Sequence, residues 1–270
     1  MANASSELPI VLYHYHYSPF AKRLVWYLNL RGIPYVQCLQ PPILPRPDLA
    51  RLGIKYRRIP ILTIGRDVYL DTRLIIQKLE PIRSASQPRL SAASSFSCSS
   101  SSSSSSAAAQ EHLALERLLE ALVVDGGIFM RAAQLLPLNL PLLRDPKFQA
   151  DRADFRADAR RPSRGETLAL QAEAANEIAA VLALLETTLL ADGRDWILAT
   201  PAPSLADIEA VWPFHWLVGL PGALDSQVVS AERLPRVFAW IDRFDRAVKA
   251  AERANGEVKT RKRLTCRIPS

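Results

Sequence analysis

The sequence predicts two domains of different fold class, an α/β domain followed by an all-helical domain. Three observations indicate this division. Runs of β-branched and aromatic residues flank a helical segment in the first third, apolar residues recur every three to four positions in the last part, and a serine-rich stretch separates the two patterns. We expect domains over residues 8–83 and 110–256, a disordered linker over 84–109 and a basic tail over 257–270.

The N-terminal domain is predicted to run β-α-β and then β-β-α. Its strands are runs in which β-branched and aromatic residues dominate, and a glycine marks the turn of the hairpin formed by the last two. The segment between the second and third strands is irregular, with room for one helical turn. The expected strands cover residues 9–15, 35–40, 60–65 and 67–71.

The first helix is predicted from its two ends. Ser18 is a good N-cap, Pro19 suits the first helical position, and Gly32 stops the helix. The apolar residues between these ends fall on one helical face. A second, short helix begins at Thr72 and ends before Pro81.

The low-complexity segment over residues 84–109 consists mostly of serine. Such a segment buries too little apolar surface to offset the entropy of ordering it, which predicts disorder. Beyond it, four segments have apolar residues at helical spacing. Ser204 and Asp207 at the start of one of them resemble a capping box. The expected helices cover residues 111–124, 166–190, 204–219 and 236–253.

Composition excludes several classes of protein. About half of the 270 residues are apolar and 23% are charged, which is typical of a globular chain. Cys38, Cys98 and Cys266 lie far apart and form no CxxC pair, so we expect neither disulfides nor a zinc site, and we expect a cytoplasmic protein. No run reaches the length of a membrane span, and the first residues lack the features of a signal peptide.

The positive charge is concentrated in the N-terminal domain. Residues 1–83 hold twelve of the 34 Lys and Arg but only five of the 27 Asp and Glu, so they carry the whole net charge of +7. Such a domain attracts anions, either nucleic acid or a small ligand that bears carboxylates. The sequence has no RNA-binding, helix-turn-helix or zinc-finger spacing, which favours the small ligand.

His14 and His16 lie two positions apart along the first strand, so their side chains are expected to point to the same side. Two histidines without a third or fourth ligand do not make a metal site, so no metal is expected. We interpret both as structural residues, with His16 in a position to border a ligand pocket.

Four motifs resemble, in the same order, those of the cytosolic glutathione transferases. "SPFAKRLVWYLNLRGIPY" resembles the first-helix segment, in which a catalytic Ser or Cys precedes Pro-Phe, and "RRIPIL" resembles the turn with a cis peptide before its proline. "YLDT" stands where the family has a Glu/Asp-Ser pair, and "PSLADIEAVW" resembles the capping box of its second domain. The resemblance is nearest to the serine or omega-like branch and to divergent fungal members. It implies a thioredoxin-like domain that binds glutathione, and a helical domain.

The resemblance implies that Ser18 hydrogen-bonds the glutathione sulfur, with Tyr13 as the alternative and Tyr17 after it. Lowering the thiol pKa from about 8.5 by two units requires about 2.7 kcal/mol of preferential thiolate binding. A hydrogen bond to a charged group supplies about 1.5–3 kcal/mol, so one hydroxyl at a helix N-terminus is enough. The other interpretation, that Ser18 only caps the helix, requires the same geometry.

The resemblance also assigns the contacts with the rest of glutathione. Ile59 and cis-Pro60 offer backbone groups to the cysteinyl part, Asp71 and Thr72 bind the γ-glutamyl end, and Arg46 binds the glycine carboxylate. Thr72 adds a methyl group to the Ser of the family pattern, which reduces the space for the ligand. Pro60 as a trans residue at a strand start, and Asp71 and Thr72 as helix caps only, stay open as alternatives. The cations that compete with Arg46 are Lys55, Arg57 and Arg58.

The implied function is conjugation of glutathione, as co-substrate, to a small hydrophobic electrophile by a cytoplasmic homodimer that acts in detoxification. Two other functions stay open. One is a non-catalytic interaction or regulatory protein of the same fold, and the other is a thiol-transferase or peroxidase, which usually has a Cys where Ser18 stands. The electrophile is expected between the domains, near residues that core packing explains equally well: Phe129, Arg131, Trp212 and His215.

Overall fold

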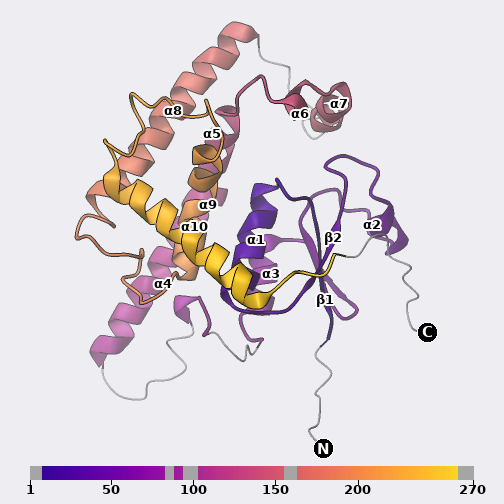
Figure 1. Ribbon diagram of the computed structural model, residues 1–270, viewed down its shortest axis with the longest axis horizontal. Helices are drawn as coiled ribbons and strands as arrows, with labels where there is room; N and C mark the ends of the chain where they lie inside the picture. Colours follow the sequence, from indigo (N-terminus) through magenta and orange to yellow (C-terminus); the bar gives the residue numbers. More distant parts are fainter. Residues whose placement is uncertain (1–7, 83–87, 94–102, 155–162, 261–270) are drawn as a thin grey trace, which may run out of the picture. The chain divides into compact units, whose positions relative to one another are not determined.

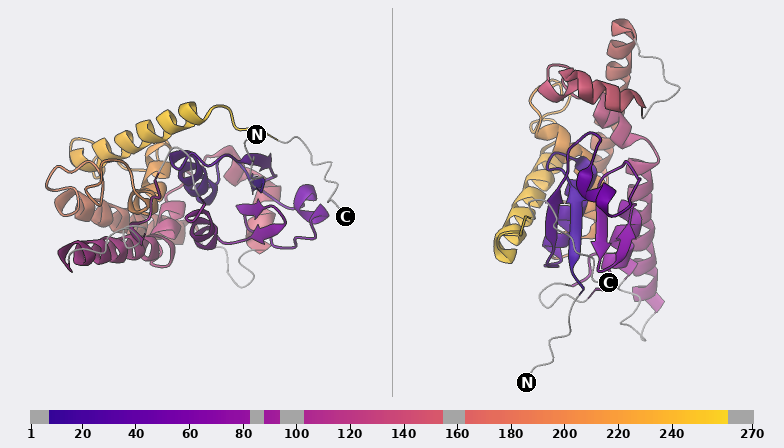
Figure 2. Two further views of the ribbon diagram at one scale, coloured as in Figure 1. Left: turned by 90° about the horizontal axis from the view of Figure 1, so that it is seen from below. Right: turned by 90° about the vertical axis from the view of Figure 1, so that its right-hand side faces the viewer.

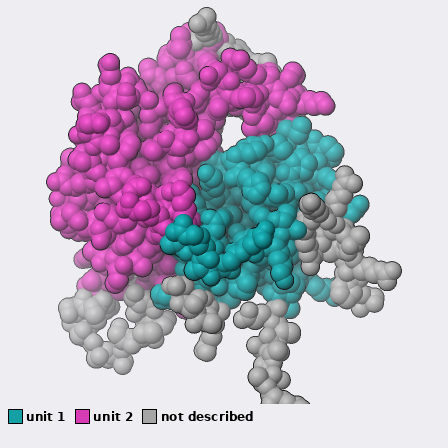
Figure 3. Space-filling view, viewed as in Figure 1, with its two compact units in different colours: residues 1–88, 250–270 teal, residues 89–249 magenta. Residues whose placement is uncertain are grey.

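The chain divides into two compact units, which are coloured separately in Figure 3. The structure, a computed structural model, describes residues 8–82, 88–93, 103–154 and 163–260. Unit 1 consists of Met1–Pro88 together with Ala250–Ser270, and unit 2 of Arg89–Lys249. The C-terminal residues from Ala250 on therefore group with the α/β unit, whereas the sequence placed residues up to 256 in the helical domain.

Unit 1 is built on a four-stranded mixed sheet with the strand order β2-β1-β3-β4 (Figure 1). β1 (Ile10–His14) pairs in parallel with β2 (Val36–Leu39) and antiparallel with β3 (Ile61–Ile64). β3 pairs antiparallel with β4 (Asp67–Tyr69). The single helical turn expected between the second and third strands is α2 (Pro47–Arg51). This confirms the predicted thioredoxin-like class and its order of elements.

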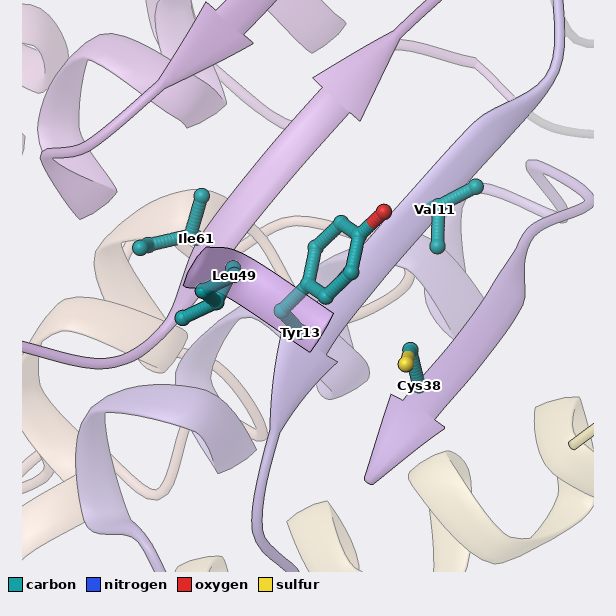
Figure 4. Packing of buried hydrophobic residues seen from close by; sticks show 5 residues of the cluster. All are labelled: Val11, Tyr13, Cys38, Leu49 and Ile61. Atoms are coloured by element: carbon teal, nitrogen blue, oxygen red, sulfur yellow. The ribbon is translucent and has the colours of Figure 1, made fainter. Parts of the chain in front are cut away.

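The two faces of the sheet are covered by different helices. α1 (Pro19–Leu30) and α3 (Thr72–Leu79) lie on one side and α2 lies on the other (Figures 1 and 2). Because side chains alternate along β1, Val11 and Tyr13 share one face. They form a buried cluster with Leu49 of α2 and with Cys38 and Ile61 of the neighbouring strands (Figure 4).

Two buried arginines, Arg23 of α1 and Arg31 at its C-cap, hold α3 at both of its ends. Arg23, which is 0% exposed, donates from Nη1 to Thr72 Oγ1 over 2.7 Å. Arg31, which is 1% exposed, donates to the carbonyl oxygens of Glu80 at 3.5 Å and Ile82 at 2.7 Å, and lies 3.8 Å from the Glu80 carboxylate. The Arg23–Thr72 and Arg31–Glu80 pairs both join residues 49 positions apart, so the two helices run parallel.

The C-terminal end of the described chain pairs with the outer edge of the sheet. Gln37 N of β2 donates to Lys259 O over 3.1 Å, and Gln37 and Thr260 form a parallel bridge. The Gln37 side chain also donates from Nε2 to Thr260 Oγ1 over 2.8 Å. The first residues of the predicted basic tail are therefore hydrogen-bonded to β2.

Unit 2 is helical, with α9 at its centre. All ten residues from Leu205 to Phe214 are buried, because α9 packs against both α4 and α5, and α5 packs in turn against α8 (Figures 1 and 2). The predicted helices are all present, and three shorter ones are added. The helices are α4 (Ser103–Val124), α5 (Ile128–Gln134), α6 (Pro141–Arg144), α7 (Pro146–Asp154), α8 (Arg164–Thr187), α9 (Leu205–Val218) and α10 (Pro235–Asn255).

Helix α4 begins within the range that the sequence assigned to a disordered linker, so residues 103–109 are helical. Residues 84–87 and 94–102 of that range lie outside the described residues. In the described segment between them, Ser91 Oγ and Ala92 N donate to the buried Glu116 of α4 over 2.7 and 2.9 Å. This segment is therefore anchored to the helix that follows it.

One stretch of α8, Gly165–Thr187, is long and apolar enough to cross a membrane by length and composition alone. The sequence analysis expected no such run. In the structure 22% of its most apolar window is buried, and Glu173 and Glu177 on the same helix pair with Arg131 of α5.

The predicted capping box at the start of α9 is present. Asp207 accepts from Ser204 N at 2.9 Å and Ser204 Oγ at 2.7 Å. Its other oxygen accepts from Ile197 N at 2.8 Å and from Trp240 Nε1 at 2.9 Å. The carboxyl group is fully buried and connects α9 to the preceding loop and to α10.

We expect Asp207→Ala to lower the free energy of unfolding by about 3 kcal/mol or more, because four buried donors lose their acceptor. Ser204→Ala is the matched control on the same cap, and its expected cost is about 1 kcal/mol. Urea denaturation followed by circular dichroism measures both. Equal losses for the two variants would contradict the central role of Asp207.

Candidate functional site

The N-terminus of α1 positions the Ser18 hydroxyl. Ser18 is the N-cap, with extended backbone angles, and its Oγ accepts from Ala21 N over 3.3 Å. Since the oxygen is the acceptor in this bond, the hydroxyl keeps its proton for donation to a second group. Ser18 itself is 2% exposed, whereas His16 and Tyr17 just before it are exposed.

Tyr13, the alternative to Ser18, lies in the buried cluster under α2 and is 3% exposed (Figure 4). It is paired in register with Cys38 on one side and Ile61 on the other. Packing explains an aromatic residue at this position, and the geometry does not favour Tyr13 as a contact of a ligand thiol.

The peptide bond between Ile59 and Pro60 is cis, as the resemblance implied. The ladder between β1 and β3 ends at the pair Tyr13–Ile61, so the backbone of Ile59 lies just beyond it. This places backbone groups next to a strand end, where an extended peptide can pair with them. A second cis bond, Leu44–Pro45, was not anticipated.

The N-terminus of α3 brings Asp71 and Thr72 together. Asp71 is the N-cap, and its Oδ1 accepts from the backbone N–H groups of Arg73 at 2.8 Å and Leu74 at 3.3 Å. Its side chain is exposed, so the carboxylate is accessible to a cation. Thr72 is 7% exposed, and its hydroxyl oxygen accepts from the buried Arg23. The capping role that the sequence left open for Asp71 is thus present.

Arg23 is the residue near these motifs that sequence reasoning missed. The signal was available, because Arg23 lies three positions after Phe20 and four before Tyr27, on the apolar face predicted for the first helix. A charged residue at such a position requires a buried partner. That partner, Thr72, lies 49 residues further along the chain and could not be identified from local spacing.

Arg46 holds a loop together. It is 7% exposed, and it donates from Nε to Pro41 O at 3.1 Å, from Nη2 to Pro42 O at 3.3 Å, and from Nη1 to Arg57 O. Because all three nitrogens bind backbone carbonyls, this arrangement does not favour Arg46 as a carboxylate ligand. Of the competing cations, Lys55 and Arg58 are exposed and Arg57 is half-buried.

The histidine pair of the first strand is asymmetric. His14 is 3% exposed, its Nε2 lies 3.2 Å from Gln37 Oε1, and its ring meets the exposed His16 edge-on with centroids 5.8 Å apart. Burial lowers the pKa of His14, and the hydrogen bond to Gln37 Oε1 opposes that shift. In the part of the chain that the structure describes, no group of three or more His, Cys, Asp or Glu is placed to hold a metal.

The residues considered for the second substrate have structural partners within unit 2. Phe129 stacks on Trp212 with ring centroids 5.0 Å apart, and Trp212 is 1% exposed. Arg131 binds Glu177 at 2.6 Å. His215 Nε2 lies 3.1 Å from Asp245 Oδ1. Core packing and ion pairs therefore account for this set.

An apolar groove of about 390 Å³ lies in unit 2 between α4 and α8, above α9. Its walls carry leucine and valine, and Thr188 supplies its only side-chain hydroxyl. The predicted site residues, all of which belong to unit 1, do not line it. The lining residues are Leu115, Leu118, Leu119, Leu122, Val123, Val181, Leu184, Leu185, Thr188, Leu189, Ala210 and Phe214.

Two family models match parts of the chain. Residues 12–87 match "Glutathione S-transferase, N-terminal domain". Residues 131–253 match a domain of unknown function, DUF7962. A search of curated proteins finds no match.

Solved structures with similar folds cover most of this chain. A rice glutathione S-transferase (OsGSTU1) in complex with glutathione is 19% identical, with 92% of this chain and 91% of that chain covered and a TM-score of 0.62. A Tau class glutathione S-transferase from mango is 17% identical, with coverages of 92% and 93% and a TM-score of 0.59. A GST-like protein from Pseudomonas syringae is 21% identical, with coverages of 93% and 69% and a TM-score of 0.56.

The fold is therefore that of the glutathione S-transferases, with a thioredoxin-like N-terminal unit and a helical second unit. The family match over residues 12–87 likens the N-terminal unit, and not the whole chain, to the glutathione S-transferases.

We expect acid to destabilise the protein through His14. Its pKa in the folded state lies below the ordinary value of 6.5, so the unfolded state binds the proton more readily, and stability falls as the pH drops below about 6.5. Urea denaturation at a series of pH values measures the effect. His14→Gln should flatten this dependence, and His16→Gln, the exposed matched control, should retain most of it, because burial and not the charge of His16 is the largest cause of the lowered pKa of His14. An unchanged slope in His14→Gln would exclude His14 as the cause.

Proposed function

We propose that the protein binds glutathione in unit 1 and conjugates its thiolate to a small hydrophobic electrophile. The N-cap position of Ser18 carries this proposal. Its oxygen already accepts the Ala21 N–H, so its proton is the group offered to the sulfur, and the positive end of α1 favours thiolate over thiol. A hydrogen bond to a charged group contributes about 1.5–3 kcal/mol, which is the scale that a shift of two pKa units requires.

The remaining contacts follow the shape of the tripeptide. The Ile59 backbone beside cis-Pro60 pairs with the cysteinyl part, the exposed Asp71 carboxylate receives the γ-glutamyl ammonium, and Thr72 receives the γ-glutamyl carboxylate at the N-terminus of α3. The rice transferase, which shares the fold and was solved in complex with glutathione, supports glutathione as the ligand. For the glycine carboxylate we propose Lys55, because it is exposed while Arg46 binds loop carbonyls.

A non-catalytic glutathione-binding protein of the same fold is the second candidate. The burial of Ser18, at 2% exposure, favours it, because an electrophile and a sulfur must both approach that hydroxyl during catalysis. Binding without turnover would support this candidate. A thiol-transferase activity is disfavoured, because Ser18 stands where that chemistry uses a thiol.

The assembly and setting are also proposals. We propose a cytoplasmic homodimer of the serine or omega-like branch that acts in detoxification and binds neither nucleic acid nor membranes. The scattered cysteines support the reducing compartment, and the other points rest on the family resemblance. Sedimentation velocity at micromolar concentration should give twice the chain mass of 30.0 kDa. A single species at the chain mass would overturn the dimer.

Ser18→Ala is expected to reduce kcat/KM for the addition of glutathione to a generic aryl halide by about 10- to 100-fold, the range of one hydrogen bond to a charged group. Tyr13→Phe should change it less than about twofold, because the ring stays in the core and only the hydroxyl is removed. Calorimetry with glutathione separates binding from chemistry. A larger loss in Tyr13→Phe than in Ser18→Ala would reverse the assignment, and wild-type protein that binds glutathione without turnover would leave only the second candidate.

A further inference from the structure

We propose that Arg23 is a positioning residue of the glutathione site, which acts through the Thr72 hydroxyl on the γ-glutamyl carboxylate. This inference rests on the proposed function, because it assumes that Thr72 meets that carboxylate. Arg23 itself does not touch the ligand. It lies on α1, is 0% exposed, and reaches Thr72 Oγ1 over 2.7 Å.

The direction of this hydrogen bond determines where the Thr72 proton goes. A guanidinium group only donates, so Oγ1 must be the acceptor, and the hydroxyl proton must point to another partner. Thr72 is the first residue of α3, where backbone N–H groups have no partner within the helix. Two of these N–H groups, those of Arg73 and Leu74, already donate to Asp71 Oδ1, so the Thr72 hydroxyl is the donor that this helix N-terminus offers to a carboxylate.

The charge of Arg23 strengthens the same donor. A hydroxyl that accepts from a cation is polarised and becomes a better donor, and this effect is largest where water is excluded. Both side chains are buried, with Arg23 at 0% and Thr72 at 7% exposure. An anion bound to the Thr72 hydroxyl therefore interacts with a full positive charge behind that hydroxyl, without contacting the arginine.

The position of Arg23 on α1 connects the two ends of the ligand. Ser18 and Arg23 are five residues apart on one helix, which is about 7.5 Å of helical rise. The helix that offers a hydroxyl to the sulfur thus also fixes the group that binds the γ-glutamyl end. Thr72 is β-branched and therefore restricted at χ1, which suits a hydroxyl that must hold one orientation. The methyl group of Thr72, which a serine lacks, thus helps to fix the orientation of the hydroxyl.

The test is a double-mutant cycle in the full chain, with Arg23→Met, Thr72→Val and the double variant. Calorimetry measures the dissociation constants of glutathione and of cysteinylglycine, which lacks the γ-glutamyl residue. Each single variant should bind glutathione about tenfold more weakly, and the double variant should be no weaker than the single ones, because Arg23 acts only through the hydroxyl. The affinity for cysteinylglycine should not change.

Arg31→Met is the matched control, because Arg31 is the other buried arginine that holds α3. It should lower the thermal unfolding temperature and change the affinities for both ligands by the same factor. Arg23→Lys, which keeps the charge and one donor, should recover part of the affinity lost in Arg23→Met.

Four results would overturn the inference. Losses that add to about a hundredfold in the double variant, or equal losses for the two ligands, would reduce Arg23 to a structural role. Wild-type affinity in Thr72→Val would exclude the hydroxyl, and this result remains available if Arg23→Met does not fold. Wild-type protein that fails to bind glutathione would overturn the proposed function as well. Glutathione binding by the wild-type protein is therefore measured before any variant is compared.

Discussion

Burial of two guanidinium groups between parallel helices is the constraint on which the geometry of unit 1 depends. A buried arginine is costly unless its donors are hydrogen-bonded, and Arg23 and Arg31 donate from their terminal nitrogens to groups at the two ends of α3. Neither helix can slide or rotate against the other without breaking these bonds. The N-termini of both helices are therefore held in fixed relation, and the proposed ligand groups are attached to those N-termini.

The chemistry of the site is mostly that of helix ends and backbone groups. Ser18 caps α1, Asp71 caps α3, and Ile59 contributes only its backbone beside cis-Pro60. Such groups bind an anionic peptide without a buried side-chain cation in direct contact with it. The excess positive charge over residues 1–83 is of the sign that attracts the anionic ligand proposed for unit 1.

Features with local signals could be predicted from the sequence, and features that depend on distant partners could not. The strands, the caps at Ser18 and Ser204 and the cis bond at Pro60 are set by neighbouring residues or by a short motif. The role of Arg46 depends on where the carbonyls of a folded loop lie, and the role of Arg23 depends on a helix 49 residues away. The serine content of residues 84–109 predicted disorder throughout that range. The last serines of the run instead form the first turn of α4, because they adjoin an amphipathic segment.

The pairing of Lys259 and Thr260 with β2 has a consequence for synthesis of the chain. Unit 1 contains residues from both sides of unit 2, so the helical unit is an insertion within it. While the ribosome is still making the helices, the outer strand of the sheet carries amide and carbonyl groups that have no neighbour. The nascent α/β unit is therefore open at that edge until Lys259 and Thr260 have emerged, and these hydrogen bonds form only after translation of the helical insertion.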